Sequence, residues 1–132
     1  MKVVLDTNVL VSALINPMGV PATILSLLLN GKLAVLYDSR ILQEYRQVLS
    51  RQKFHFELSL ILHLLDYIRH EGEFIAIEPL RVPTVNEDDK MFYEVAKTGK
   101  AEYLVTGNKR HFPNDEIVRT PKEFVEIYLS KE

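Results

Sequence analysis

Short apolar runs alternate with amphipathic stretches along the chain. Five of these runs have the length and composition of buried strands. They cover Val3–Leu5, Leu33–Tyr37, Phe74–Ile77, Tyr103–Val105 and Glu116–Val118. The stretches between the runs repeat apolar residues at helical spacing. Because strands that alternate with helices pair in parallel through right-handed crossovers, the pattern predicts an α/β fold with a parallel sheet.

Capping and stop signals mark the ends of the predicted helices. One helix follows Asp6 directly, and the last begins with a capping box of Thr120 and Glu123, with Pro121 in its first turn. The other helices are expected over Pro21–Asn30, from Asp38 or Ser39 through Leu49, over Phe56–Arg69 and over Asp88–Thr98. The longest irregular stretch is Pro79–Asn86, which precedes an acidic cluster.

Asp6 ends the first apolar run and stands in front of the first helix. In open parallel sheets, ligands bind outside the carboxyl ends of the strands, so Asp6 lies where such a fold carries out its chemistry. Aspartate is also a favoured residue at the N-terminal cap of a helix. Taken alone, Asp6 therefore fits a capping role as well as a catalytic one.

The composition narrows the class of protein. With 132 residues, of which 47% are hydrophobic, the chain predicts one folded domain over residues 1–132. The net charge of −2 excludes a global basic field, so any nucleic acid would bind through a local patch or metal ions. The absence of cysteine excludes disulfides and thiolate chemistry and fits a reducing cytoplasm, where we expect the protein to act. The apolar stretch Ala22–Leu29 is too short to cross a bilayer, so no membrane association is expected.

Acidic and amide residues recur beside the ends of the predicted strands. Asp6 follows the first strand, Glu44 lies on the helix after the second, Glu87-Asp88-Asp89 begins the helix before the fourth, and Thr106-Gly107-Asn108 follows the fourth. If the first and fourth strands are neighbours, Asp6, Asp89 and Asn108 can converge. Oxygen ligands without cysteine or clustered histidine suit Mg²⁺ or Mn²⁺. Such a metal could activate water and neutralise charge on a phosphodiester.

Each acid also has an ordinary structural explanation. Glu44 lies one helical turn after Arg40, so the two could form an exposed ion pair. Asp88 and Asp89 suit the first turn of a helix through capping and the helix dipole. For any single acid this explanation is at least as good as a catalytic role. The set is spread over three elements, however, and that favours a shared site.

Four motifs in order resemble the PIN-domain ribonucleases, and within them the toxin-like branch of small bacterial and archaeal proteins. The resemblance covers nearly the whole chain and rests on the segments Val3–Leu10, Ser39–Leu49, Asp88–Ala96 and Ala101–Pro113. No single motif is specific, but their order is. In the third motif the usual acid stands seven residues before a small residue, here Ala96, which selects Asp89 over Asp88.

The resemblance implies a three-layer α/β/α sandwich whose parallel five-stranded sheet has the order 3-2-1-4-5. It also implies an endoribonuclease that depends on Mg²⁺ or Mn²⁺, often as the toxin of a toxin–antitoxin pair. The metal ligands would be Asp6, Glu44 and Asp89, and Asn108 would be the fourth catalytic position. The supporting residues would be Thr7, Asn8 and Thr106.

Asn108 departs from the aspartate that many family members carry at this position. Its amide keeps an oxygen that can ligate but lacks the negative charge, so we expect weaker metal affinity. Asp115 could substitute, although a loop role is the simpler expectation. The next residues, Lys109, Arg110 and His111, are expected either to hold RNA phosphates at the edge of the cleft or to form a solvated turn.

The helix over Phe56–Arg69 carries more leucine and isoleucine than one core face needs. We interpret the excess as a surface for a second subunit, which would give a homodimer, or for an antitoxin protein. The alternative is burial beneath the Pro79–Asn86 loop.

Other functions fit the sequence less well. A non-catalytic PIN module that binds RNA or protein is the main alternative, and Asn108 makes it plausible. A phosphatase of the haloacid-dehalogenase type would need a second acid where Asn8 stands. A receiver domain would need an aspartate near Ile77-Glu78-Pro79 and a lysine near Arg119-Thr120, and neither residue is present.

Overall fold

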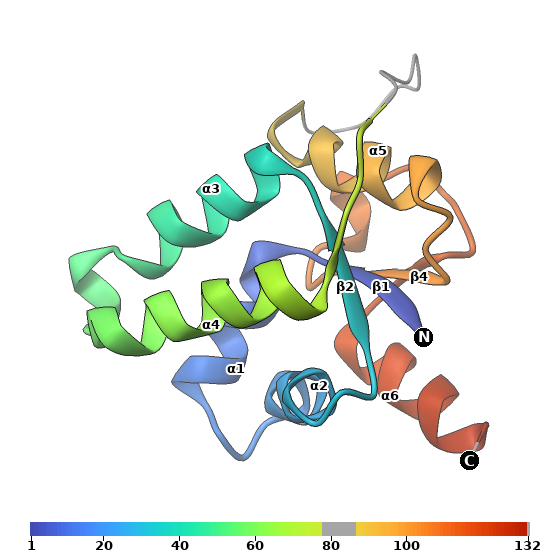
Figure 1. Cartoon of the computed structure of the whole chain (residues 1–132). Helices are drawn as coiled ribbons and strands as arrows, with labels where there is room; N and C mark the ends of the chain where they lie inside the picture. The colour runs from blue at the N-terminus through green and yellow to red at the C-terminus, as the bar shows by residue number, and fades with distance from the viewer. Residues whose placement is uncertain (78–86, 132) are drawn as a thin grey trace.

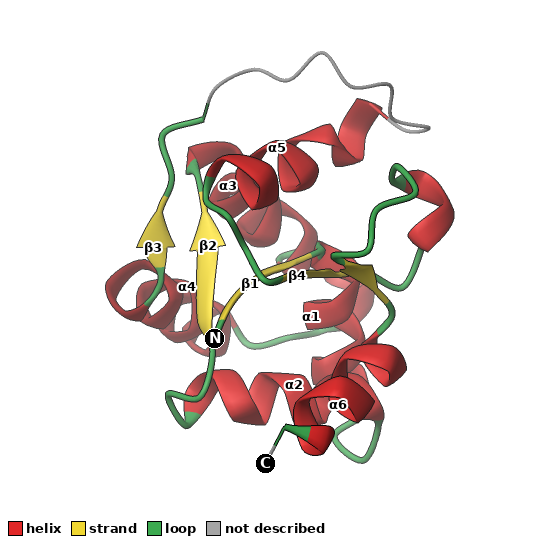
Figure 2. Ribbon diagram, turned by 90° about the vertical axis from the view of Figure 1, so that its right-hand side faces the viewer, coloured by secondary structure: helices red, strands yellow, loops and turns green. Residues whose placement is uncertain are grey.

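The structure is a computed structural model that describes residues 1–77 and 87–131, so the predicted irregular stretch Pro79–Asn86 lies outside the described residues. Five short strands form one sheet: β1 (Lys2–Leu5), β2 (Ala34–Tyr37), β3 (Glu73–Phe74), β4 (Tyr103–Val105) and β5 (Val118–Arg119). Every neighbouring pair is parallel, and the order is β3-β2-β1-β4-β5 (Figure 2). The predicted strand order is therefore confirmed.

Helices pack around this sheet and give the expected α/β/α arrangement. They are α1 (Thr7–Ile15), α2 (Val20–Leu29), α3 (Ser39–Leu49), α4 (Leu58–Glu71), α5 (Lys90–Thr98) and α6 (Pro121–Ser130). In Figures 1 and 2, α3 and α5 lie near the carboxyl ends of the strands, whereas α2 and α6 lie next to each other toward the opposite end. Among the described helices none is by itself long and apolar enough to span a membrane, although α1 and α2 together form a bent pair that passes on length and composition.

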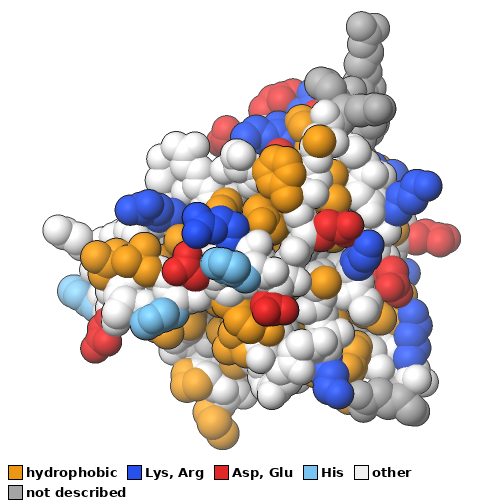
Figure 3. All heavy atoms as spheres, in the orientation of Figure 1, with side chains coloured by type: hydrophobic (Ala, Val, Ile, Leu, Met, Phe, Trp, Pro, Cys, Tyr) orange, Lys and Arg blue, Asp and Glu red, His pale blue; other side chains and the backbone are white. Residues whose placement is uncertain are grey.

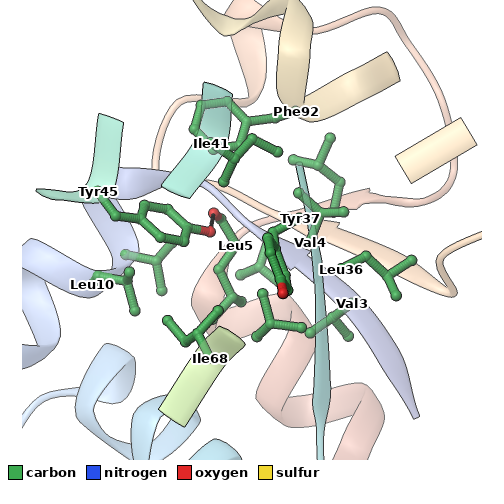
Figure 4. Close-up of a cluster of buried hydrophobic side chains, with 14 of the residues drawn as sticks. Val3, Val4, Leu5, Leu10, Leu36, Tyr37, Ile41, Tyr45, Ile68 and Phe92 are labelled. Atoms are coloured by element: carbon green, nitrogen blue, oxygen red, sulfur yellow. Dashed lines mark hydrogen bonds between the residues drawn. The ribbon is translucent and has the colours of Figure 1, made fainter. Parts of the chain in front are cut away.

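The central strands are buried runs of aliphatic residues, as expected for a parallel sheet that helices cover. Val3, Val4 and Leu5 of β1 are fully buried and belong to the same apolar cluster as Tyr45 of α3 (Figure 4). The buried Tyr45 hydroxyl donates a hydrogen bond to the carbonyl of Leu5. A buried hydroxyl needs such a partner, and this bond fixes α3 against the end of β1, directly before Asp6.

The edge strand β3 is shorter than the predicted strand. It ends at Phe74 rather than Ile77, because its neighbour β2 ends at Tyr37, where the chain turns into α3. Ile75 makes a last backbone hydrogen bond to the Tyr37 carbonyl, at 2.8 Å. Beyond that point β2 offers no backbone for further pairing.

The other edge strand, β5, begins later than predicted. It starts at Val118 rather than Glu116. The reason is a local turn, because the Asp115 carboxylate accepts the backbone N–H of Ile117 at 3.1 Å. That bond takes up the amide before it can join the sheet.

Helix boundaries follow local chemistry more closely than the apolar pattern. The Asp38 carboxylate accepts the backbone N–H of Ile41 at 3.0 Å, so Asp38 rather than Ser39 caps α3. The helix α4 begins at Leu58, because His55 adopts a left-handed conformation at φ 55° before it. The acids at Glu87–Asp89 form a short 3₁₀ turn, and α5 begins only at Lys90.

Two further boundaries agree with the sequence. The capping box of α6 is confirmed: the Thr120 hydroxyl accepts the Glu123 amide at 3.1 Å, and the Glu123 carboxylate accepts the Thr120 amide at 2.9 Å. Gly72 ends α4, and glycine is a typical residue at the end of a helix. A Cβ there would lie 2.5 Å from the carbonyl oxygens of both Ile68 and Val35, so only glycine lets the chain pass from α4 to β3 at this point.

Candidate active site at the carboxyl end of the sheet

The pairing of β1 with β4 brings Asp6 beside Thr106. The Asp6 backbone N–H donates to the Val105 carbonyl at 2.9 Å, and the Thr106 hydroxyl donates to the Asp6 carboxylate at 2.7 Å. The Asn8 amide also donates to the Asp6 carboxylate, at 3.3 Å. Although Asp6 occupies the cap position of α1, its side chain makes no capping hydrogen bond. The capping explanation of Asp6 is therefore wrong, and its carboxylate is oriented by β4 and by Asn8.

Glu44 joins this site from α3. Its carboxylate accepts a hydrogen bond from the Thr7 hydroxyl, one residue after Asp6. The suggested ion pair between Glu44 and Arg40 does not form, because Arg40 contacts Asp38 and Glu94 instead. The Thr7 hydroxyl thus orients Glu44 rather than Asp6.

Asp89 approaches from the N-terminal end of α5. It makes no side-chain capping bond, and its carboxylate lies 2.9 Å from Nδ1 of His111. His111 was expected at the RNA-binding edge, so its contact with Asp89 was missed. Asp88 is exposed and Asp89 is half-buried, which agrees with the choice of Asp89 as the candidate ligand.

The crowded carboxylates change each other's protonation. Burial raises the pKa of Asp6 from 3.8 to about 6, the Thr106 hydrogen bond opposes the rise, and the charges of Asp89 and Glu44 add to it. Burial likewise raises the pKa of Glu44; the Thr7 hydrogen bond opposes this, and the nearby Asp89 and Asp88 add to it. Like charges in a poorly solvated site repel one another unless a proton or a cation lies between them. The site therefore favours a bound cation at neutral pH.

Asn108 lies beside these acids but contributes mainly through its backbone. Its N–H donates to the Thr106 hydroxyl at 3.0 Å, and the next bond along the turn runs from the Gly107 N–H to the Asn8 side chain at 3.1 Å. The Asn108 side chain is exposed and forms no hydrogen bond to a described residue. As a fourth site position, Asn108 therefore stays a prediction.

Asp115 does not replace the missing charge. Its carboxylate accepts hydrogen bonds from the Tyr93 hydroxyl at 2.7 Å and from Lys97 at 3.0 Å. Although partial burial works in the opposite direction, these bonds and the Ile117 N–H hold the pKa of Asp115 below its usual value. Asp115 is a loop residue that ties α5 to the start of β5.

Comparison with known proteins identifies the family. The sequence model of the PIN domain matches residues 2–110. The chain belongs to the PIN-domain family. An uncharacterized protein of Methanocaldococcus jannaschii is 33% identical over 145 residues, which span 96% of this chain and 91% of that protein. No solved structure matches the chain. PIN domains are generally nucleases.

The donor chemistry of this PIN domain fits a hard divalent cation. Asp6, Glu44 and Asp89 offer only carboxylate oxygens, which Mg²⁺ and Mn²⁺ prefer. Within residues 1–77 and 87–131, no group of three or more His, Cys, Asp or Glu side chains is arranged so that it could hold a metal ion. Mg²⁺ keeps several waters and needs only one or two protein carboxylates, so it does not require such a group.

The raised pKa of Asp6 predicts how the metal-free protein responds to pH. The folded state holds the Asp6 proton more tightly than the unfolded chain, so the stability from that proton is present below about pH 4 and is lost as pH rises through about 6. Asp6→Asn removes this loss. With a chelator present, the free energy of unfolding of the variant relative to wild type should rise by up to about 3 kcal/mol between pH 4 and pH 7.5.

Urea unfolding at the two pH values measures this gain. Asp115→Asn is the control: because the pKa of Asp115 is lowered, its stabilising effect is largely present already at pH 4 and is lost only at lower pH, so the difference between this variant and wild type should stay nearly constant between the two pH values. A difference between Asp6→Asn and wild type that does not change with pH would contradict the electrostatic description of the site.

Proposed function

We propose that this protein is an endoribonuclease that depends on Mg²⁺ or Mn²⁺ and hydrolyses phosphodiester bonds in RNA. The observation that carries the proposal is the crowding of Asp6, Glu44 and Asp89. They follow β1, lie on α3 and precede α5, respectively. Burial raises the pKa of Asp6 to about 6, and the charges of Asp89 and Glu44 add to the rise. Folding alone gives no reason to crowd three acids, whereas a cation held between them does. Family membership supports nuclease activity and RNA as the substrate class.

In this proposal each acid has a partner that orients it. Thr106 and Asn8 orient Asp6, Thr7 orients Glu44, and His111 orients Asp89. Partners of this kind fix the direction of metal ligands. When bound, a divalent cation would supply a more acidic water as nucleophile and charge neutralisation for the phosphodiester. Asn108 would bind through its amide oxygen or through water, with less electrostatic attraction than an aspartate.

The RNA would approach over the turn that carries Arg110. Arg110 is exposed beside the site. The charge of Lys109 is partly neutralised, because its ammonium lies 3.1 Å from the Glu123 carboxylate. Phosphate contacts position a nucleic acid without reading its sequence, so this patch would hold the strand rather than select it.

We also propose that the nuclease is the toxin of a toxin–antitoxin pair and acts in the cytoplasm. The support is an apolar surface on α1, α2 and α4. Leu58, Leu60 and Leu62 of α4 are exposed, and hydrophobic side chains are visible on the face that carries this helix (Figure 3). A groove of about 290 Å³ is lined by Leu14, Leu25, Leu29, Leu60, His63, Leu64 and Tyr67. Exposed apolar patches of this kind mark protein interfaces, and an antitoxin or a second subunit of a homodimer would cover it.

The first test is cleavage of a labelled RNA by Asp6→Asn and Asp89→Asn. Both changes are nearly isosteric and remove charge from the site, so they should abolish cleavage while the protein stays folded. Chelator should abolish cleavage by wild type, and Mn²⁺ should restore it. Expression of wild type, but not of either variant, should arrest cell growth if the protein is a toxin.

Asp66→Asn is the matched control, because Asp66 is an exposed acid on α4 that pairs with its neighbour Arg69. It should cleave RNA as wild type does. If both site variants cleave as well as Asp66→Asn, the site is misassigned. If wild type neither binds Mn²⁺ nor cleaves RNA, the non-catalytic PIN module is the better description.

The second test is the salt dependence of RNA affinity. Removing both side chains with Lys109→Ala and Arg110→Ala should reduce the slope of log affinity against log salt by up to ~2, about one for each lost phosphate contact. Arg110→Ala should account for the larger share, because Lys109 is paired with Glu123. Lys122→Ala, an exposed lysine on α6, is the control. An unchanged slope in the double variant would assign the patch to a solvated turn.

A further inference from the structure

Arg40 links three elements that surround the candidate site. Its Nε and Nη2 lie 2.9 and 2.8 Å from one oxygen of Asp38, at the carboxyl end of β2. Its Nη1 lies 2.9 Å from the carboxylate of Glu94 on α5. Because Arg40 itself belongs to α3, one guanidinium joins β2, α3 and α5. We call these three residues the Arg40 bridge.

The chemistry of the bridge requires an arginine. The Asp38 and Glu94 side chains are only 7% and 5% exposed, so two nearly buried carboxylates share one cation. The planar fork of a guanidinium presents separate N–H groups to both, whereas a lysine ammonium is a single point charge. Removing charges from water offsets most of the attraction in a buried ion pair. The Arg40 side chain itself is 43% exposed and its two partners are nearly buried, so the bridge fixes the position of both carboxylates relative to α3.

The bridge lies within reach of two site acids. Glu44 follows Arg40 by four residues on α3, and Glu94 follows Asp89 by five residues along the turn and α5. At about 1.5 Å per helical residue, each acid stands roughly 6 to 8 Å along its helix from the bridge. The helices α3 and α5 pack against each other (Figure 1). A shift between these helices would therefore move Glu44 and Asp89 relative to each other.

The other polar contacts of the acids orient their carboxylates but do not join α3 to α5. The Thr7 hydroxyl orients the Glu44 carboxylate, and His111 orients that of Asp89. On its other side α5 is tied to the loop before β5 through Tyr93 and Asp115. Among the described residues, α3 and α5 meet through the buried rings of Tyr45 and Phe92, whose centroids lie 6.4 Å apart, and through the polar contact between Arg40 and Glu94.

We propose that Arg40 is a positioning residue for the nuclease reaction: through Glu94 it sets the separation of α3 and α5, and thereby the separation of Glu44 and Asp89. The inference rests on the proposed function, since it assigns these two acids to metal binding. It adds residues to the site that neither bind the metal nor touch the RNA.

The experiment compares Arg40→Lys and Glu94→Gln with wild type. Loss of a group that orients metal ligands typically weakens metal binding by about 10- to 100-fold, so Mn²⁺ affinity in calorimetry should fall at least about tenfold in both variants. In RNA cleavage the kcat should fall and the KM should stay nearly constant, because neither residue contacts RNA.

A second readout needs no metal. The chain has no cysteine, so spin labels can be placed through Gln47→Cys on α3 and Lys100→Cys just after α5, both at exposed positions. In metal-free protein the distance distribution between the labels should be narrow. It should broaden or shift when Arg40→Lys or Glu94→Gln is added.

Thr120→Ala is the control for lost stability. It removes the capping box of α6, away from α3 and α5, and should lower the melting temperature without changing Mn²⁺ affinity or the label distance. The proposal is overturned if both bridge variants keep the Mn²⁺ affinity and the label distance of wild type, as Thr120→Ala does. If wild type itself binds no Mn²⁺ and cuts no RNA, the nuclease assignment fails, and with it the catalytic role of the bridge. The label distance then still reports whether the bridge sets the helix separation.

Discussion

Parallel pairing between β1 and β4 places Asp6 beside Thr106, and the rest of the candidate site is arranged around that pair. The pairing runs through Leu5 and Val105, the last residues of the two strands. On its other edge β1 pairs with β2, whose end leads into α3. The sheet order therefore reverses at β1, and Asp6 stands at the point where open α/β sheets bind their ligands. Each of the other acids reaches this point from a helix packed above the strand ends.

The same convergence creates an electrostatic conflict. Burial and neighbouring charges raise the pKa of Asp6 to about 6, so the metal-free site holds its negative charges against their mutual repulsion. A cation that binds only the folded chain would relieve the conflict and stabilise the fold at the same time. Under the proposed function, catalysis and stabilisation by a metal would share this physical origin. In the metal-free protein, hydrogen bonds from Thr106 and Thr7 hold the carboxylates of Asp6 and Glu44 in place.

The sequence predicted the centre of the fold better than its edges. Buried strands such as β1 and β4 appear in the sequence as continuous apolar runs, and their predicted bounds differ from the observed bounds by at most one residue. The two-residue edge strands β3 and β5 depend on where a neighbour ends, which a local pattern does not contain. Helix starts failed for a similar reason, because a left-handed His55 and a 3₁₀ turn at Glu87–Asp89 override the apolar period.

For the candidate site, the sequence singles out acids that the fold brings to one end of the sheet, but it does not predict the residues that contact them. The motifs singled out Asp6, Glu44 and Asp89, and the fold brings all three to one end of the sheet. The partner of Arg40 was misjudged, because Glu94 lies 54 residues further along the chain and reaches Arg40 only through tertiary packing. The contact between His111 and Asp89 is equally non-local. The Asn108 side chain forms no hydrogen bond within residues 1–77 and 87–131, so its place in the site stays a prediction.

The claim at the centre of this account is that one divalent-cation site lies among Asp6, Glu44 and Asp89. Anomalous diffraction from crystals grown with Mn²⁺ tests it most directly. We expect a manganese peak at the carboxyl ends of β1 and β4, from an ion bonded to Asp6 and to at least one of the two other acids. Manganese bound only elsewhere, or those carboxylates free of metal at saturating Mn²⁺, would contradict it.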